Sequence, residues 1–185
     1  MERVSLDEIE PDSADPDRRS DRRPLSDRLG TTDVSIAHYT LEPGERFSGS
    51  LHTHIDQEEI FVVLEGEATF ETKTSGETAD ADGLDVSAAN DGETGGTDEV
   101  VVGETEAIRF APGEFQTGRN AADERLVALA LGAPKDSTDV RIARIPVLDD
   151  LDVSCPACER DNMALSRGDD ADFECPTCGE LMTLE

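Results

Sequence analysis

Apolar and polar side chains alternate over several short runs of the chain, the pattern that half-buried β-strands produce. The clearest runs lie at 34–41, 60–70, 99–113, 125–134 and 140–147. Turn-forming residues separate the strands: Pro43-Gly44 follows the first run, and Glu65-Gly66 divides the second. No long helical period accompanies them. Short strands with frequent turns predict an all-β barrel or sandwich.

Two segments lack this alternation. Residues 1–30 are rich in Asp and Arg, contain no aromatic residue and are interrupted by prolines, so we predict a charged N-terminal arm whose last part, PLSDRLG, docks on the barrel. Residues 71–99 hold nine acids, one base and five glycines, which predicts a flexible acidic insertion. The expected organisation is therefore an arm at 1–30, a barrel at 31–148 and a small C-terminal unit at 152–185.

The charge of the chain narrows its choice of partners. Acids outnumber bases 44 to 16, so the formal net charge is −28 at pH 7. This acidic surface repels phosphate, which excludes nucleic acid and anionic membranes as expected partners. A disordered acidic protein would share this composition, but five of the six phenylalanines fall between Phe47 and Phe115. We therefore favour a folded, halophilic protein whose charges are screened by salt.

The cellular compartment follows from what the sequence lacks. No apolar run approaches the roughly 18 residues that a membrane-spanning helix needs. The N-terminal MERVSLDEIE lacks the basic and then apolar order of a signal peptide. We expect a cytoplasmic protein, and in that reducing compartment cysteines are predicted to bind metal rather than to form disulfides.

The segment LHTHIDQEEIFVVLEGEATF contains the first candidate site. On a strand, His52 and His54 point to the same face, and Glu59 can approach from a neighbouring strand after a short loop. Two imidazoles and a carboxylate suit a divalent transition metal, although the His-x-His pattern alone also fits two surface histidines. The third histidine, His38, and the only tyrosine, Tyr39, are interpreted as packing or rim residues. An inward-facing His38 would be a candidate acid or base.

This segment resembles the first sequence motif of the cupin family. In that motif three or four residues separate His-x-His from a Glu, and six more separate the Glu from a Gly. His52, His54, Glu59 and Gly66 reproduce this spacing, with four and six intervening residues. Seven residues separate Gly44 from His52, where the family usually has five, so the loop between them is two residues longer. The resemblance covers about residues 34–145 and implies a small jelly-roll-like cupin barrel.

A second cupin motif is present in a weaker form. The run TEAIRFAPGEFQTGRN aligns with it through Gly113 and Asn120, and departs from it at Thr105 and Ala111. Gln116 stands where the family carries a further histidine ligand. A glutamine carbonyl is a weaker donor to transition metals than imidazole.

The resemblance implies a barrel metal held by His52, His54 and Glu59, with Gln116 as a weak fourth ligand or a neighbour. The three stronger ligands leave positions open for substrate or oxygen and are compatible with Fe, Mn, Ni or Zn. A decayed site that binds no ion is the alternative. The whole chain resembles small uncharacterised cupins of haloarchaea.

The C-terminal tail contains a second candidate metal site. Cys155 and Cys158 form one C-x2-C pair, and Cys175 and Cys178 form another after sixteen residues, a spacing that fits a zinc ribbon. A tail this short cannot fold on an apolar core alone, so Zn2+ would supply its folding energy. An iron site of the rubredoxin type is a lesser alternative, because the tail has a single aromatic residue, Phe173. Nine acids against two arginines argue again against nucleic acid.

These observations lead to one functional prediction and two alternatives. We expect a metal-binding cupin that binds or converts a small polar molecule, with a structural zinc ribbon. The alternatives are a non-catalytic ligand sensor whose ribbon contacts a protein partner, and a redox module with iron in the ribbon. No P-loop, dinucleotide-binding glycine motif or serine triad is present, and every cysteine lies in the tail. The sequence leaves the substrate, the barrel metal and a homodimeric state open.

Overall fold

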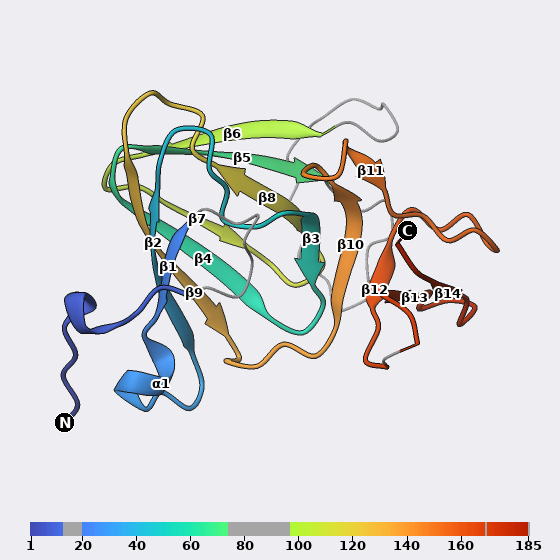
Figure 1. Cartoon of the computed structure of the whole chain (residues 1–185), viewed down its shortest axis with the longest axis horizontal. Helices are drawn as coiled ribbons and strands as arrows, with labels where there is room; N and C mark the ends of the chain where they lie inside the picture. The colour runs from blue at the N-terminus through green and yellow to red at the C-terminus, as the bar shows by residue number, and fades with distance from the viewer. Residues whose placement is uncertain (13–19, 74–96, 169, 185) are drawn as a thin grey trace, which may run out of the picture.

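The computed structural model describes residues 1–12, 20–73, 97–168 and 170–184. Within these residues the strands form two sheets, called sheet A and sheet B below (Figure 1). Sheet A has the order β1 (Asp21–Pro24), β2 (Ser35–Leu41), β9 (Leu126–Ala133), β4 (Glu58–Glu65) and β7 (Ala107–Phe110). Sheet B has the order β14 (Leu181–Met182), β13 (Phe173–Glu174), β12 (Met163–Leu165), β10 (Val140–Ile145), β3 (Leu51–His54), β8 (Phe115–Arg119), β5 (Glu67–Lys73) and β6 (Asp98–Gly103), and β11 (Leu151–Asp152) also pairs with β10.

Helices are confined to two short N-terminal elements in the described part of the chain, η1 (Leu6–Glu8) and α1 (Ser26–Leu29). The predicted all-β fold class is therefore confirmed. Neither helix has the length or the apolar character needed to cross a bilayer.

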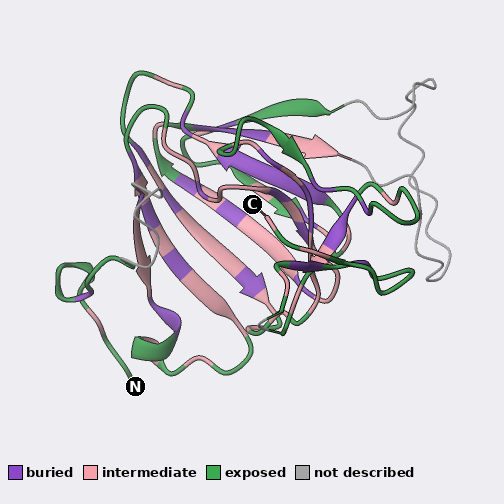
Figure 2. Ribbon diagram, turned by 45° about the vertical axis from the view of Figure 1, so that its right-hand side comes forward, coloured by how far each residue is buried: buried purple, intermediate pink, exposed green. Residues whose placement is uncertain are grey.

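The runs of alternating residues become strands at the predicted places. Burial alternates clearly in β2, whereas β5 buries the three consecutive residues Ala68, Thr69 and Phe70. Figure 2 shows buried residues as separate bands within several strands. Gly66 makes the turn between β4 and β5 with a φ of 79°, a left-handed conformation that favours glycine. A Cβ at this position would lie 2.6 Å from the carbonyl oxygen of Arg125, so the turn also requires a residue without a side chain.

The structure differs from the predicted segment boundaries in two places. The end of the arm forms β1, which pairs with β2 from Asp21 opposite Thr40 to Pro24 opposite Ala37. In the predicted insertion, residues 71–73 belong to β5 and residues 98–99 to β6. The rest of that prediction lies at 74–96, outside the described residues.

An aromatic cluster lies in the main hydrophobic core of the barrel. Phe47 contacts Phe61 and Phe70 with ring centroids 5.0 and 5.6 Å apart, and Phe110 lies 5.4 Å from Phe70. Tyr39 packs edge-on against Phe47 at 5.1 Å. These contacts bury much of the barrel's aromatic surface.

The C-terminal strands have a second core of their own. It contains Val153, Cys155, Met163, Phe173 and Cys175, together with Ile142 and Ile145 of β10. Because β12 pairs with β10, the cysteine-rich unit continues sheet B at its edge, as Figure 1 shows.

Candidate functional site

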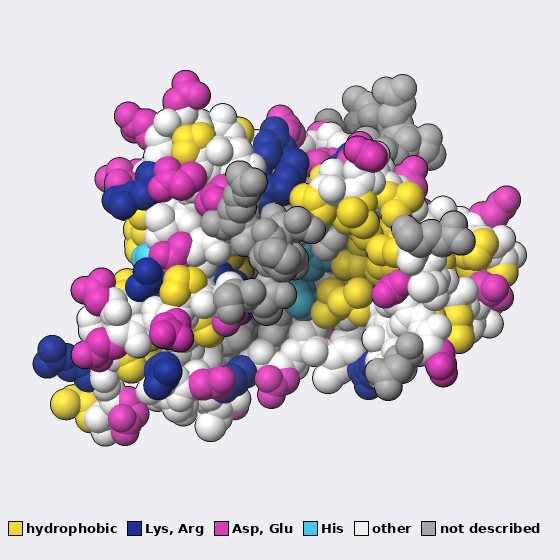
Figure 3. All heavy atoms as spheres, in the orientation of Figure 1, with side chains coloured by type: hydrophobic (Ala, Val, Ile, Leu, Met, Phe, Trp, Pro, Cys, Tyr) yellow, Lys and Arg dark blue, Asp and Glu magenta, His cyan; other side chains and the backbone are white. Residues whose placement is uncertain are grey.

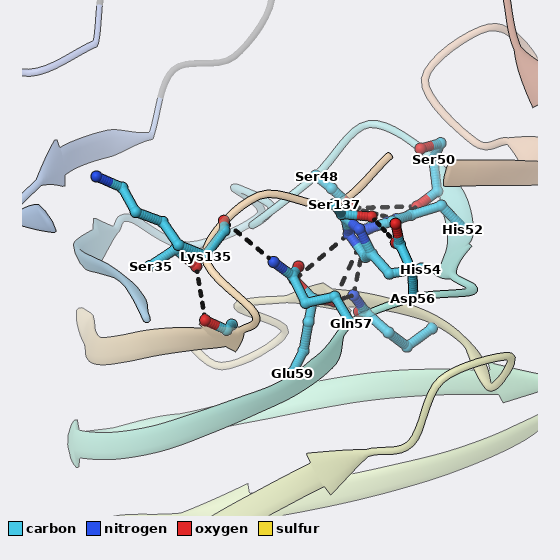
Figure 4. A network of polar contacts seen from close by, with 12 residues as sticks. Ser35, Ser48, Ser50, His52, His54, Asp56, Gln57, Glu59, Lys135 and Ser137 are labelled. Atoms are coloured by element: carbon cyan, nitrogen blue, oxygen red, sulfur yellow. Dashed lines mark hydrogen bonds and ion pairs between the residues drawn. The ribbon is translucent and has the colours of Figure 1, made fainter. Parts of the chain in front are cut away.

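Three elements bring the predicted barrel ligands together. His52 and His54 project from the same face of β3, and Glu59 comes from β4 in the facing sheet. One ligand atom from each of these residues lies within 4.8 Å of the others. Gln116 on β8 stands directly opposite His52 in the strand register. Figure 4 shows the two imidazoles and Glu59 pointing toward one another.

The distances fit a metal site after a small adjustment. His54 Nε2 lies 3.6 Å from Glu59 Oε1, and His52 Nε2 lies 4.0 Å from Glu59 Oε2. Ligands about 2.1 Å from an ion stand roughly 3.0–3.4 Å from one another, so modest side-chain rotations would close the set. All three side chains are partly buried, with between 12% and 20% of their surface exposed.

Hydrogen bonds prepare His52 for metal binding. Its Nδ1 lies 3.0 Å from the carbonyl oxygen of Ser50 and 3.4 Å from Ser48 Oγ. A proton on Nδ1 is donated to this carbonyl, which leaves the Nε2 lone pair directed at Glu59 and His54. This arrangement is the usual outer support of a metal-bound histidine.

His54 is favoured in its neutral form. Burial lowers the pKa of His54, against the opposing effect of the Glu59 carboxylate. A neutral imidazole is the form that binds metal. Its Nδ1 is buried and has no hydrogen-bond partner among the described residues.

Gln116 contacts the predicted ligands in a way that its sequence position does not reveal. Its Nε2 donates a hydrogen bond of 2.8 Å to Glu59 Oε2 and lies 3.4 Å from His52 Nε2. The side chain is 2% exposed, and Oε1 has no partner among the described residues. In this orientation Gln116 holds the carboxylate, while rotation of the amide by half a turn would offer Oε1 to an ion.

Substitution of Gln116 tests these contacts. We expect Gln116→His to tighten Mn2+ binding by the barrel roughly tenfold or more, because an imidazole replaces a weak oxygen donor next to His52. The matched variant Gln116→Leu removes the hydrogen bond to Glu59 and should weaken Mn2+ binding by about 10- to 100-fold. Titration monitored by electron paramagnetic resonance measures both. Unchanged affinity in both variants would show that Gln116 does not act on the ion.

His38 and Tyr39 lie away from the ion ligands. On β2, Ala37, Tyr39 and Leu41 are buried in the barrel core, so His38 faces the other side of sheet A. There it stands opposite Arg23 of β1. Tyr39 packs in the core, and its hydroxyl accepts a hydrogen bond of 2.9 Å from Arg22 Nε. His38 does not face inward, so it is not a candidate acid or base near the barrel metal.

Asp56 is a supporting residue that sequence reasoning missed. It lies in the turn between His54 and Glu59 and accepts hydrogen bonds from the Ser137 hydroxyl and from the amide and hydroxyl of Thr138. These bonds hold the pKa of Asp56 well below its usual value. The turn that spaces two predicted ligands is thus fastened to the segment before β10. An Asp in a turn is too common to reveal this partner in advance.

The four cysteines form a compact cluster. Cys155 Sγ lies 3.6 Å from Cys178 Sγ, and Cys158 Sγ lies 3.6 Å from Cys175 Sγ. Zinc–sulfur bonds of about 2.3 Å in a tetrahedron place the sulfurs roughly 3.8 Å apart, so the cluster fits Zn2+ with little change. Cys155 and Cys175 are buried, whereas Cys158 and Cys178 are exposed.

The two cysteine loops share one backbone pattern. The Cys155 amide donates to the Arg160 carbonyl and the Glu159 amide to the Cys155 carbonyl, and Cys175 repeats both bonds with Glu180 and Gly179. Glu159 and Gly179 occupy equivalent positions with φ of 59° and 76°. Burial alone would raise the pKa of the Cys175 thiol, but the backbone amides of Cys178 and Thr177 and the neighbouring thiols lower it to about 6. A thiolate is the form that binds zinc.

Comparison with known proteins identifies the fold. No family model matches the chain, and no curated protein matches it. A sugar phosphate isomerase of the cupin superfamily from Silicibacter pomeroyi is 20% identical over 75% of this chain and 78% of that chain, with a TM-score of 0.52. An oxalate oxidase in complex with glycolate is 15% identical over 75% of this chain and 61% of that chain, with a TM-score of 0.51.

These similarities show a cupin-type barrel, as the sequence motif predicted. At such low identity they show the fold alone. The chain therefore combines a cupin-type barrel fold with a four-cysteine unit, and each part carries a cluster of side chains that could hold a metal ion.

Proposed function

We propose that the protein holds a divalent transition metal in its barrel and uses it to bind or convert a small polar molecule. The supporting observation is the convergence of His52, His54 and Glu59, with the His52 ring oriented by the Ser50 carbonyl. Three protein ligands leave coordination positions for a substrate. When bound, such an ion acts as a Lewis acid on substrate oxygens.

Polar atoms around the ligands support a polar substrate. Gln116 Oε1 and His54 Nδ1 are buried, and neither has a partner among the described residues. A buried polar atom is costly unless it is satisfied, so a bound molecule with a hydroxyl group gains from donating a hydrogen bond to Gln116 Oε1. Gln116 also keeps the Glu59 carboxylate in place through its amide.

The four-cysteine unit is proposed as a structural zinc ribbon. Its sulfur geometry and the backbone pattern that its two cysteine loops share support zinc. The single aromatic residue of this unit, Phe173, lies in its core beside Cys175.

A non-catalytic sensor is the second candidate. Its support is a group of exposed apolar residues where the barrel meets the ribbon, Val147, Leu148 and Leu151. Such residues are typical of a surface that contacts another protein. Turnover of a bound molecule would favour the first candidate, and binding without turnover the second.

The experiment uses protein purified in high salt and loaded with Mn2+. We expect a small hydroxy-acid or a sugar phosphate to alter the electron paramagnetic resonance spectrum of the barrel ion and to bind in calorimetry. Glu59→Gln should abolish both signals because it removes the only charged ligand of the set. Glu58→Gln is the matched control, because Glu58 lies next to Glu59 in the sequence but forms an ion pair with Arg109 instead. A spectrum that no compound of either class changes would contradict a substrate at this ion.

A further inference from the structure

The strand that carries both histidines depends on its neighbour β10. Strand β3 pairs with β10 along its whole length, with Leu51 opposite Arg144, His52 opposite Ile142 and His54 opposite Val140. Its pairing with β8 on the other side is confined to His52 opposite Gln116, and the Gly113 amide before β8 adds one hydrogen bond of 3.0 Å to the His54 carbonyl. The position of the two imidazoles is therefore set chiefly by β10.

Strand β10 is in turn held by the cysteine-rich unit. On its far edge it pairs with β12, where Ile142 lies opposite Met163. The Val153 amide adds a hydrogen bond of 2.9 Å to the Ala143 carbonyl. Lys73 of β5 reaches Asp161 with an ion pair of 2.7 Å, and Arg167 donates to the Thr138 carbonyl. Without these partners β10 would be a free edge strand.

Ile142 and Val140 connect the two candidate metal sites, the histidine site in the barrel and the four-cysteine cluster. Ile142 is the cross-strand neighbour of His52, is 5% exposed, and belongs to the core that contains Cys155 and Cys175. Val140, the neighbour of His54, packs against the same core. Figure 3 shows apolar side chains over β10 and β12 beside the cyan histidine atoms near the middle of the view.

This second core depends on metal. Its strands β11 to β14 are two or three residues long, too short to hold a sheet by backbone pairing alone. A unit of this size forms around its zinc, and its core disperses when the zinc is lost. The packing of Ile142 would then be lost with it.

We infer that zinc in the four-cysteine cluster sets the metal affinity of the barrel, through β10 and its apolar pair Val140 and Ile142. The four-cysteine unit thus holds β10, and through it the histidine strand β3, in place, and the two ions bind cooperatively. Because binding linkage is reciprocal, an ion in the barrel also strengthens zinc binding by the same factor. The inference rests on the proposed binding of an ion by His52 and His54.

The main test removes the ribbon zinc from the full-length chain with Cys155→Ser and Cys175→Ser together. We expect Mn2+ affinity of the barrel to fall by about 10- to 100-fold, the usual effect of losing support behind metal ligands. Hydrogen exchange of β3 amides should accelerate, while β4 and β9 in sheet A stay protected and so show that the barrel is folded. Unchanged Mn2+ affinity or unchanged β3 exchange overturns the inference, as does loss of protection throughout sheet A.

A second pair of variants keeps all four cysteines. Ile142→Ala should weaken Mn2+ binding several-fold while the zinc content is retained. Val102→Ala, a buried aliphatic residue of β6 in the same sheet, is the matched control and should leave Mn2+ affinity unchanged. Equal losses in the two variants would overturn the inference, because general destabilisation would then explain the effect.

Exchange of β3 separates this inference from the proposed function. Hydrogen exchange of β3 is measured without an ion in the barrel, so its result does not depend on Mn2+ binding. A wild-type barrel that fails to bind Mn2+ contradicts the proposed function only. A strand β3 that does not respond to ribbon zinc contradicts the link between the two clusters.

Discussion

Replacing His52 and His54 together with alanine removes the barrel ion and leaves the ribbon zinc in place. Each lost imidazole should cost at least the 10- to 100-fold that a supporting residue costs, so the barrel affinity falls roughly 1000-fold or more. The four-cysteine cluster does not use either histidine, so its zinc stays bound, with an affinity lowered only by the coupling between the two sites. Elemental analysis of protein purified in high salt measures both ions.

The third histidine provides the control for this experiment. His38 is on the other side of sheet A from the barrel core, so His38→Ala should retain both ions. A double variant that keeps the metal content of the wild type would show that the barrel binds no ion through β3. The proposed function would then lose its main support.

Transfer from molar to millimolar monovalent salt abolishes cooperative folding of the barrel. The net charge of −28 produces repulsion that molar salt screens within about 3 Å. The ion pairs do not offset it, since exposed pairs such as Arg109–Glu58 and Arg125–Glu65 each contribute about 0–1 kcal/mol. Circular dichroism during thermal unfolding at a series of salt concentrations measures the effect. Lowering the pH toward the carboxylate range should restore part of the stability.

The β5–β6 pair allows a direct test of the charge argument. These strands pair in register up to Thr72 opposite Asp98, so residues 74–96 can be replaced by Asn-Gly, which suits a two-residue hairpin turn. The replacement removes six acids and no base. We expect it to lower the salt concentration needed for folding while barrel metal binding persists. A full-length protein that is equally stable in dilute buffer contradicts the halophilic interpretation.

Local sequence patterns predicted the strands and pointed to the side chains that the structure gathers in its two clusters. Alternation marks β2, β4 and β9 because one face of each strand is buried and the other is not. His52 and His54 were recognisable because two residues apart on a strand always share a face. The cysteines were recognisable because tetrahedral zinc sites use characteristic short spacings. Each of these signals lies within a stretch of a few residues.

The partners of these elements come only from the tertiary structure. The pairing of β12 with β10 and of β1 with β2 joins residues through backbone groups that nearly every residue carries, so no side-chain pattern announces it. For the same reason the Ser50 carbonyl that orients His52 has no sequence signature. Gln116 was found by its position in a motif, but its hydrogen bond to Glu59 depends on how sheets A and B face each other. Ligand types are therefore readable along the chain, whereas their support is decided by packing between distant strands.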